Sequence, residues 1–384
     1  MKTPLAARLD KIQPFRVMAV LARAHELERQ GRSIIHMEIG EPDFPTASGI
    51  VRAAVRAIEA GHTHYLPALG LPELRERIAG SYPPGARPAA GRVVVTPGAS
   101  GALQLIFAAL LNPGDQVLMT DPGYPCNRHF VSLFEGEARA ILVDARTEYQ
   151  LDAALVRKHW TARTVAVLLS SPSNPTGTLV SEEHMAEIVA AVRELGGRLI
   201  VDEIYGGLTY GVEAKTVLAH SQDVFVVNSF SKYYGMTGWR VGWLVTPESY
   251  ISAIDKLAQN IFIATGTPSQ YGALAAFKPQ VEKELRRRVQ IFRERRDYLL
   301  PALRDLGFDI PVTPQGAFYF YADCTRFTTD SQQFALDLLE RSGVAVTPGL
   351  DFGVNQPECY IRFSYATTLE NLQEGVRRLR AYLA

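Results

Sequence analysis

Lys232 has the type and position of a reactive amine. It follows shortly after the apolar run Val224–Val227 and lies between the hydroxyl groups of Ser231 and Tyr233. A lysine held near other cationic groups loses its proton and becomes a nucleophile toward a carbonyl carbon. Arg240 follows in the same stretch, where its planar guanidinium can bind an anion through two hydrogen bonds. The alternative is a charged surface loop, but the many aromatic residues and glycines of this stretch argue against it.

Three more polar segments directly follow apolar runs. Asp202 ends the run that begins at Arg198, and a carboxylate buried there needs a cation or a protonated nitrogen as partner, unless it caps the next helix. Asn174 lies in a loop made rigid by two prolines and a glycine. The small residues of Thr96–Gly101 precede an apolar helix, where backbone N–H groups can bind an anion. A tight strand-to-helix turn needs the same small residues.

The elements that position these residues alternate between strand and helix. Helical spacing predicts helices over 101–111 and 181–195, with Ser181 as the N-cap of the second. Apolar runs without polar alternation indicate a parallel sheet that is covered on both faces, and ligands of such a sheet bind beyond the carboxyl ends of its strands. The predicted strands cover residues 93–95, 116–119, 164–169, 198–201 and 224–227.

The C-terminal part has a different pattern. Residues 282–306 predict a long charged helix, whose interleaved acidic residues favour a solvated face over a nucleic-acid patch. Strands are expected at 317–321 and 360–364, and helices at 332–341 and 369–382. Thr367 and Glu370 have the spacing of a capping box before the last helix. These elements predict a smaller α+β domain.

The run from Ser229 to Arg240 resembles the pyridoxal-phosphate lysine signature of the class I/II aminotransferases, the aspartate-aminotransferase-like family of fold type I. Further motifs follow in the family's order, and the similarity extends from Gly40 to the C-terminus. They are Gly40–Phe44, Tyr65 through Gly70 to Arg75, Asp121–Pro125, Asn174–Gly177, Asp202–Tyr205 and Arg362 within Ile361–Ser364. The resemblance implies an α/β fold with a mostly parallel, seven-stranded sheet between helices in a large cofactor domain, residues 46–284. Residues 1–45 and 285–384 would form the small domain.

The resemblance also implies how pyridoxal 5′-phosphate is held. Lys232 would form a Schiff base with it and carry the proton during the reaction, and Asp202 would pair with its pyridine nitrogen. Asn174 and Tyr205 would hydrogen-bond its 3-oxygen, and Tyr124 would stack on its ring. The residues expected at its phosphate are Ala99, Ser100, Ser229, Ser231, Arg240 and, from the other subunit, Tyr65.

The implied activity is the exchange of amino and oxo groups between an L-amino acid and a 2-oxo acid by a ping-pong mechanism. Arg362, Gly40 and Asn174 would bind the substrate, with Arg362 on the α-carboxylate. A lyase or decarboxylase on the same fold is the alternative, because the cofactor supplies the carbanion chemistry in all three reactions. The Tyr65 motif implies a homodimer with shared sites. The side-chain preference stays open, and Arg16 is one candidate for binding a distal carboxylate.

The composition excludes several other classes of protein. The 384 residues contain forty Lys+Arg and forty Asp+Glu, so no net field attracts nucleic acid or an anionic membrane. No apolar run reaches the length of a membrane span, and the first ten residues do not resemble a signal peptide. Three cysteines cannot form a disulfide framework, and no ligand spacing suggests a metal. The composition therefore predicts a soluble, cytoplasmic globular protein, and the family resemblance implies an enzyme of amino acid metabolism.

Overall fold

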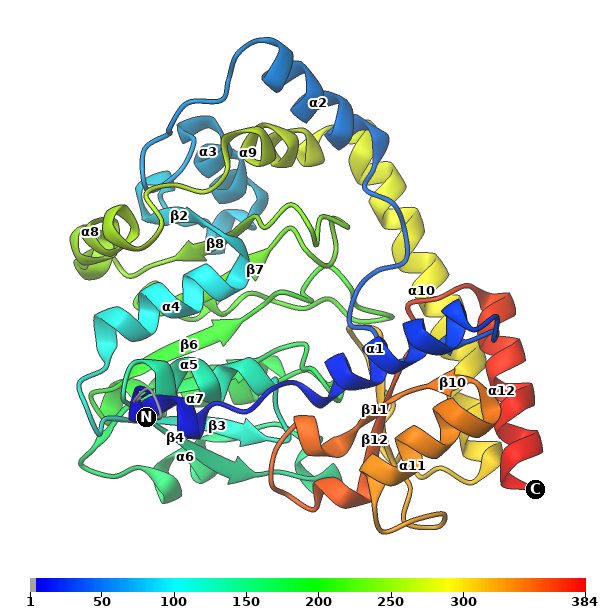
Figure 1. Ribbon diagram of the computed structural model, residues 1–384. Coiled ribbons are helices and arrows are strands. Elements are labelled where there is room, and N and C mark those ends of the chain that lie inside the picture. The colour runs from blue at the N-terminus through cyan, green and yellow to red at the C-terminus, as the bar shows by residue number, and fades with distance from the viewer. Residues whose placement is uncertain (1–4) are drawn as a thin grey trace.

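A computed structural model describes residues 5–384 (Figure 1). Its central sheet has seven strands in the order β2-β8-β7-β6-β5-β3-β4, and β8 alone runs antiparallel to its neighbours. The mostly parallel, seven-stranded sheet is therefore confirmed. The strands are β2 (Val93–Thr96), β3 (Gln116–Asp121), β4 (Glu137–Leu142), β5 (Thr164–Ser170), β6 (Arg198–Asp202), β7 (Phe225–Ser229) and β8 (Gly242–Val245).

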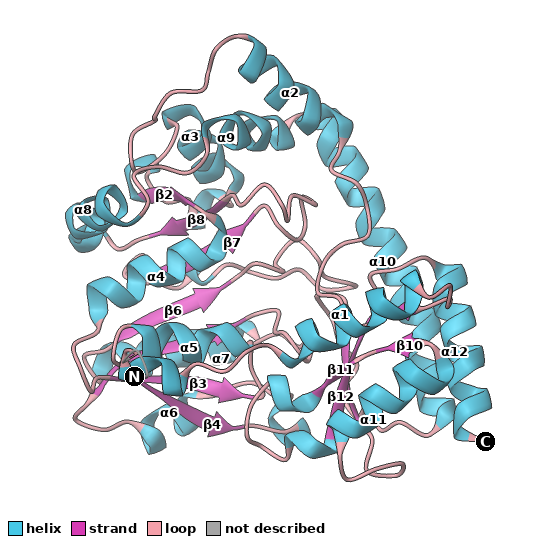
Figure 2. Cartoon of the chain, viewed as in Figure 1, coloured by secondary structure: helices cyan, strands magenta, loops and turns pink. Residues whose placement is uncertain are grey.

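Alternate residues of the central strands enter different cores, because successive side chains of a strand point to opposite faces. Val94 of β2 packs in one core with residues of α4 and α8, while Val93 and Val95 pack in the other with residues of α3 and α7. Both faces are thus covered by helices (Figure 2). The helices around the sheet are α2 (Ser48–Glu59), α3 (Pro72–Ser81), α4 (Gly98–Leu110), α5 (Pro125–Leu133), α6 (Ala153–His159), α7 (Glu182–Glu194), α8 (Ile251–Ile261) and α9 (Thr267–Leu274).

The C-terminal part has a sheet and a core of its own. Strands β9 (Tyr319–Asp323), β11 (Thr347–Pro348) and β12 (Tyr360–Ser364) form an antiparallel sheet, in the order β11-β12-β9. The N-terminal chain joins this part, since β1 (Ile35–His36) pairs with β10 (Val344–Ala345). Its helices are α1 (Arg16–Arg29), α11 (Ser331–Asp337), α12 (Leu369–Leu383) and the long α10 (Pro279–Leu306), which runs on into it from the sheet side (Figure 1). This core consists mostly of residues from the C-terminal part, which agrees with the predicted domain division, and the division stays a prediction.

Most predicted elements are confirmed to within a few residues, including Ser181 as N-cap of α7, where its hydroxyl accepts from the His184 N–H. The expected cap of α12 was wrong by one residue: Thr368, not Thr367, accepts from the Asn371 N–H. Strand β9 begins at Tyr319 rather than at 317, because Ala317 has a left-handed φ of 58° that interrupts a strand. Among the described residues, no helix is long and apolar enough to span a membrane.

Candidate active site

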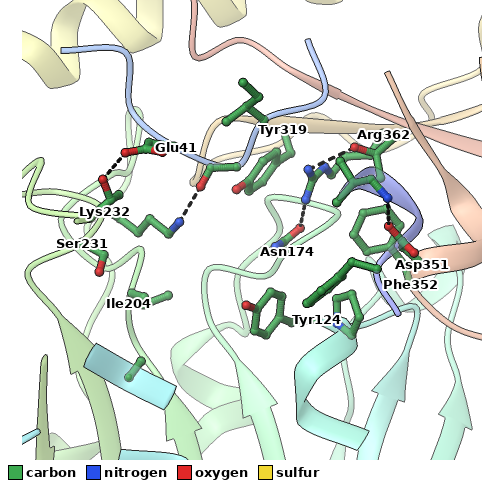
Figure 3. Close-up of a pocket in the computed structure, with 18 of the residues that line it drawn as sticks. Glu41, Tyr124, Asn174, Ile204, Ser231, Lys232, Tyr319, Asp351, Phe352 and Arg362 are labelled. Atoms are coloured by element: carbon green, nitrogen blue, oxygen red, sulfur yellow. Dashed lines mark hydrogen bonds between the residues drawn. The ribbon is translucent and has the colours of Figure 1, made fainter. Parts of the chain in front are cut away.

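A cavity of about 340 Å³ lies beyond the carboxyl ends of the central strands, between the sheet and the C-terminal part (Figure 3). This position follows from the parallel strands, whose carboxyl ends meet at one edge of the sheet. Most of the predicted site residues line the cavity. They are Gly40, Ala99, Ser100, Tyr124, Asn174, Asp202, Tyr205, Ser231, Lys232, Arg240 and Arg362.

Lys232 extends into this cavity from the loop that follows β7 (Figure 3). Its Nζ donates a hydrogen bond of 2.5 Å to the Gly40 carbonyl oxygen. Burial, aided by the positive charge of Arg362, lowers the pKa of the amine to about 8. The neutral, nucleophilic form of the amine is therefore far more populated near neutral pH than it is for a lysine in water.

Asp202 ends β6 and is only 6% exposed. Its carboxylate accepts a hydrogen bond from the Ile204 backbone N–H at 3.0 Å, and the positive charge of Lys232 acts on it as a smaller effect. Burial raises the pKa of this carboxyl group to about 6. A buried carboxylate with so little compensation favours a protonated nitrogen in the cavity as partner.

The N-terminus of α4 forms one end of the cavity together with Arg240 and Ser231. Gly98, the first residue of α4, has a φ of 67°, and a Cβ there would collide with the Arg240 guanidinium. Arg240 itself has a left-handed φ of 53°, which costs free energy for a residue with a side chain. The strained backbone brings a guanidinium, a hydroxyl and the positive end of a helix together, an arrangement that binds anions.

Arg362 lies on β12 and reaches the other end of the cavity (Figure 3). Its Nη1 donates to Asn174 Oδ1 at 2.9 Å, and its Nη2 donates to the Glu38 carbonyl oxygen at 2.7 Å. The guanidinium carbon lies 4.3 Å from the centroid of the Tyr319 ring and 4.9 Å from that of Phe352. These contacts hold the planar group in one orientation, which suits two-point binding of a carboxylate.

Three tyrosines complete the interior of the site. The hydroxyl groups of Tyr205 and Tyr319 lie 2.9 Å apart, and Tyr124 Oη accepts from Cys126 Sγ at 3.3 Å. Burial raises the pKa of all three tyrosines, so they stay protonated and can donate hydrogen bonds at neutral pH. The sequence analysis missed Tyr319: its aromatic strand was expected, but nothing in that run distinguishes the one hydroxyl that faces the cavity.

The structure leaves three candidates outside the cavity. Ser229 lies behind it, with its hydroxyl 2.9 Å from that of Ser231. Tyr65 is 83% exposed and does not line the cavity of its own chain. Arg16 also lies outside, and its guanidinium reaches Gln332 Oε1 at 3.5 Å. Within residues 5–384, no group of three His, Cys, Asp or Glu side chains could hold a metal ion.

Comparison with known proteins gives a consistent result along the whole chain. Residues 32–379 match the family described as aminotransferase class I and II. A "(5-formylfuran-3-yl)methyl phosphate transaminase" of Methanocaldococcus jannaschii is 36% identical over 99% of both chains, and a "valine–pyruvate aminotransferase" of Mycobacterium tuberculosis is 37% identical over 97% of both. A structure of Thermus thermophilus aspartate aminotransferase with maleate has a TM-score of 0.94 at 33% identity and full coverage of both chains. The protein thus has the fold of these enzymes, and the chain belongs to the class I and II aminotransferases, a family that uses pyridoxal phosphate.

Proposed function

We propose that this aminotransferase moves an amino group between an L-amino acid and a 2-oxo acid in two half-reactions, by a ping-pong mechanism with pyridoxal 5′-phosphate. One observation carries the proposal: a buried amine with a lowered pKa, Lys232, and a buried carboxylic acid with a raised pKa, Asp202, line the same cavity. A lysine that must react with an aldehyde and a carboxylate that must pair with a ring nitrogen need these two environments.

The residues of the cavity fit the cofactor at each of its polar groups. Ala99 and Ser100 at the start of α4, with Ser231 and Arg240, suit a phosphate. Asp202 suits the protonated ring nitrogen, and the Tyr205 hydroxyl and the Asn174 amide suit the ring oxygen. The cofactor, when bound, provides the electron sink that stabilises negative charge at the substrate Cα.

The substrate would be oriented by Arg362, whose fixed guanidinium binds the α-carboxylate. A side chain at residue 40 would meet the Tyr319 hydroxyl at 2.8 Å, so glycine allows the backbone to approach this place closely. With the carboxylate held at one end of the cavity, the neutral Lys232 amine would take the proton from the substrate Cα as a general base, and the resulting ammonium group would give it up again as a general acid.

We further propose that the active protein is a homodimer, in which Tyr65 reaches the phosphate group in the partner's site. The Tyr65 side chain is 83% exposed in the single chain, and Ile261 and Ile263 are half exposed. Large side chains that a single chain leaves exposed are candidates for burial in an interface between subunits. A symmetric dimer would bury them on both subunits at once.

Reduction with borohydride followed by mass spectrometry tests the proposal. We expect a pyridoxyl group on the peptide that contains Lys232, and no label in Lys232→Ala. In addition, 2-oxo acid formation from an amino acid should require an added 2-oxo acid acceptor. Release of ammonia, CO₂ or an eliminated product without an acceptor would contradict transamination and support a lyase or decarboxylase instead.

A further inference from the structure

The backbone from Glu38 to Gly40 borders the cavity and contacts both of its functional cations. The Glu38 carbonyl oxygen accepts from Arg362 Nη2 at 2.7 Å and from Thr347 Oγ1 at 3.0 Å. Two residues later, the Gly40 carbonyl oxygen accepts from Lys232. The position of this backbone therefore helps to determine where the guanidinium proposed to bind the α-carboxylate lies.

The Glu38 side chain ends in a fully buried carboxylate. Its Oε1 lies 2.7 Å from His36 Nδ1, while its Oε2 is buried and has no hydrogen-bond partner among residues 5–384. The Nε2 of the same imidazole lies 3.1 Å from Oε1 of Glu28, which is on α1. An imidazole between two carboxylates favours the protonated ring, because that form donates from both nitrogens. The buried charge of Glu38 is therefore balanced by His36.

The charge of His36 is set by these two carboxylates. From α1, the side that also provides Glu28, the ring of His25 lies 6.0 Å from that of His36, measured between centroids. Strand β10 contributes apolar residues, and on α12 the charge of Arg378 is paired with that of Glu374. The hydrogen bond to Glu38 is the main cause that raises the pKa of His36 to about 9, and Glu28 adds to it.

The proposed dimer leaves this ion pair to its own chain. Figure 1 shows α8, which ends at the exposed Ile261, on the opposite side of the molecule from β10 and α12. Helices α2 and α3, between which Tyr65 lies, are also far from β10 and α12 in this view. A partner subunit that docks on that side lies away from His36 and does not change its charge.

We propose that Glu38 and His36 are positioning residues for Arg362: their ion pair holds the Glu38 carbonyl against the guanidinium, and loss of the imidazole proton weakens binding of the α-carboxylate. The inference rests on the proposed function for the role of Arg362. Once the imidazole is neutral, the buried carboxylate has lost its counterion. An uncompensated buried charge is costly, so the backbone of Glu38 is driven toward water and away from the guanidinium.

Calorimetric titration of the cofactor-loaded protein with 4-methylpentanoate tests the proposal without the chemistry, because this ligand has a carboxylate but no amino group. At pH 7.5, where the wild type has the ion pair, His36→Asn and Glu38→Gln should bind the ligand several-fold more weakly than the wild type. The ratio of variant to wild-type dissociation constants should then fall toward one as the pH rises through about 9, since the wild type loses the same pair.

This ratio cancels the effect of other groups that titrate in the same range, such as Lys232. Equal dissociation constants at pH 7.5 would overturn the inference. A ratio that stays constant up to pH 10 would overturn it as well, because the ionised form of the imidazole would then not matter.

Two further variants separate positioning from stability. His36→Arg keeps a positive charge beside Glu38 throughout this pH range, so it should restore part of the affinity and bind equally well above pH 9. The matched control is Glu340→Gln, which breaks an ion pair with Arg23 of α1 and should leave the affinity unchanged. If Glu340→Gln weakens binding as much as His36→Asn does, the effect is one of stability alone and the positioning role is refuted.

Half-reaction kinetics show which step the ion pair affects. With an amino acid that reacts, His36→Asn should raise KM several-fold and lower kcat by less, because the variant alters binding and not the reacting amine. A fall in kcat alone would contradict the inference. If no amino acid reacts but the binding ratio still follows pH as expected, the proposed transamination fails and the positioning role stands.

Discussion

The environment of one amine determines how readily the protein can take up an aldehyde. A lysine in water has a pKa near 10.4, whereas burial and Arg362 lower that of Lys232 to about 8. We therefore expect the rate at which the cofactor-free protein combines with pyridoxal phosphate to rise with pH and level off above about 8. Stopped-flow absorbance would measure it, with Nα-acetyl-lysine as the control. A rate that continues to rise beyond pH 10 would show that the amine is not perturbed.

Asp202 should affect turnover far more than cofactor binding. In Asp202→Asn the shape of the site is kept, but the negative charge that would hold the ring nitrogen in its protonated form is lost. We expect turnover to fall by several orders of magnitude, as electrostatic stabilisation of several kcal/mol implies. Absorbance would follow cofactor binding, and single-turnover kinetics the reaction.

A neighbouring carboxylate provides the matched control for this variant. Glu203 is also buried, and burial raises its pKa to about 7, but it does not line the cavity and instead accepts from the Val217 N–H. Glu203→Gln should therefore lower stability with little effect on turnover. If both variants turn over at near-normal rates, Asp202 does not have the role assigned to it.

At the scale of elements, the pairing of β1 with β10 includes an ionised histidine. His36 Nδ1 lies 2.7 Å from Glu38 Oε1, and Nε2 lies 3.1 Å from Glu28 Oε1. The hydrogen bond to Glu38, which is fully buried, is the main cause that raises the pKa of His36 to about 9. A pKa above the unfolded value stabilises the fold fully below pH 6.5, and this contribution is lost as the pH rises through 9.

We therefore expect the free energy of unfolding of the wild type, relative to His36→Asn, to fall by on the order of 2 kcal/mol between pH 6 and 10. Urea unfolding at several pH values would measure the difference. Glu28→Gln removes only the exposed partner of the imidazole and should reduce the effect in part. A pH-independent difference would mean that the imidazole gains no proton on folding.

The apolar runs predicted the parallel strands well because those strands are buried on both faces, which leaves an uninterrupted apolar pattern. Strands β4 and β8 were not predicted as runs for opposite reasons. Edge strand β4 has mostly half-buried or exposed residues, whereas β8 is only four residues long and follows directly on the loop of Lys232. For both, pairing with neighbours decides the structure, and a single sequence does not contain that information.

The candidate site, like the strands, could be predicted only in part from the sequence. Residues at or just after strand ends, such as Asp202 and Lys232, could be expected in one place because the carboxyl ends of parallel strands meet at one edge of the sheet. Their roles came from the family resemblance. Two of the groups that accept hydrogen bonds from Arg362 could not be predicted. The Glu38 carbonyl is a backbone atom 324 residues away in the sequence, and Thr347 is one threonine among many. Asp351, whose carboxylate accepts from the Arg16 and Val17 N–H groups at the start of α1, could not be predicted either, because this contact exists only in the folded chain.

At the scale of the whole molecule, the proposed dimer makes each site depend on both subunits. Lys232 would come from one subunit and Tyr65 from the other. Hybrids of Lys232→Ala with Tyr65→Ala subunits should then contain one intact site, formed by the remaining Lys232 and Tyr65. An equal mixture, dissociated and reassembled, should regain about a quarter of wild-type activity by random pairing.

The two parent variants, assayed before mixing, are the controls for this experiment, and size-exclusion chromatography reports the assembly state. Activity of the mixture no higher than the average of its parents would contradict a shared site. An active monomer would contradict the dimer itself.

The carbonyl groups of Glu38 and Gly40 accept from Arg362 and Lys232, so one short piece of backbone ties together a guanidinium from near the end of the chain and an amine from its middle. During translation, the lysine loop leaves the ribosome more than a hundred residues before the arginine. A nascent chain can already contain the amine, yet it lacks the guanidinium that is proposed to bind the α-carboxylate until β12 has been synthesised and docked. In the proposed function, substrate binding therefore has to wait until almost the whole chain has been synthesised.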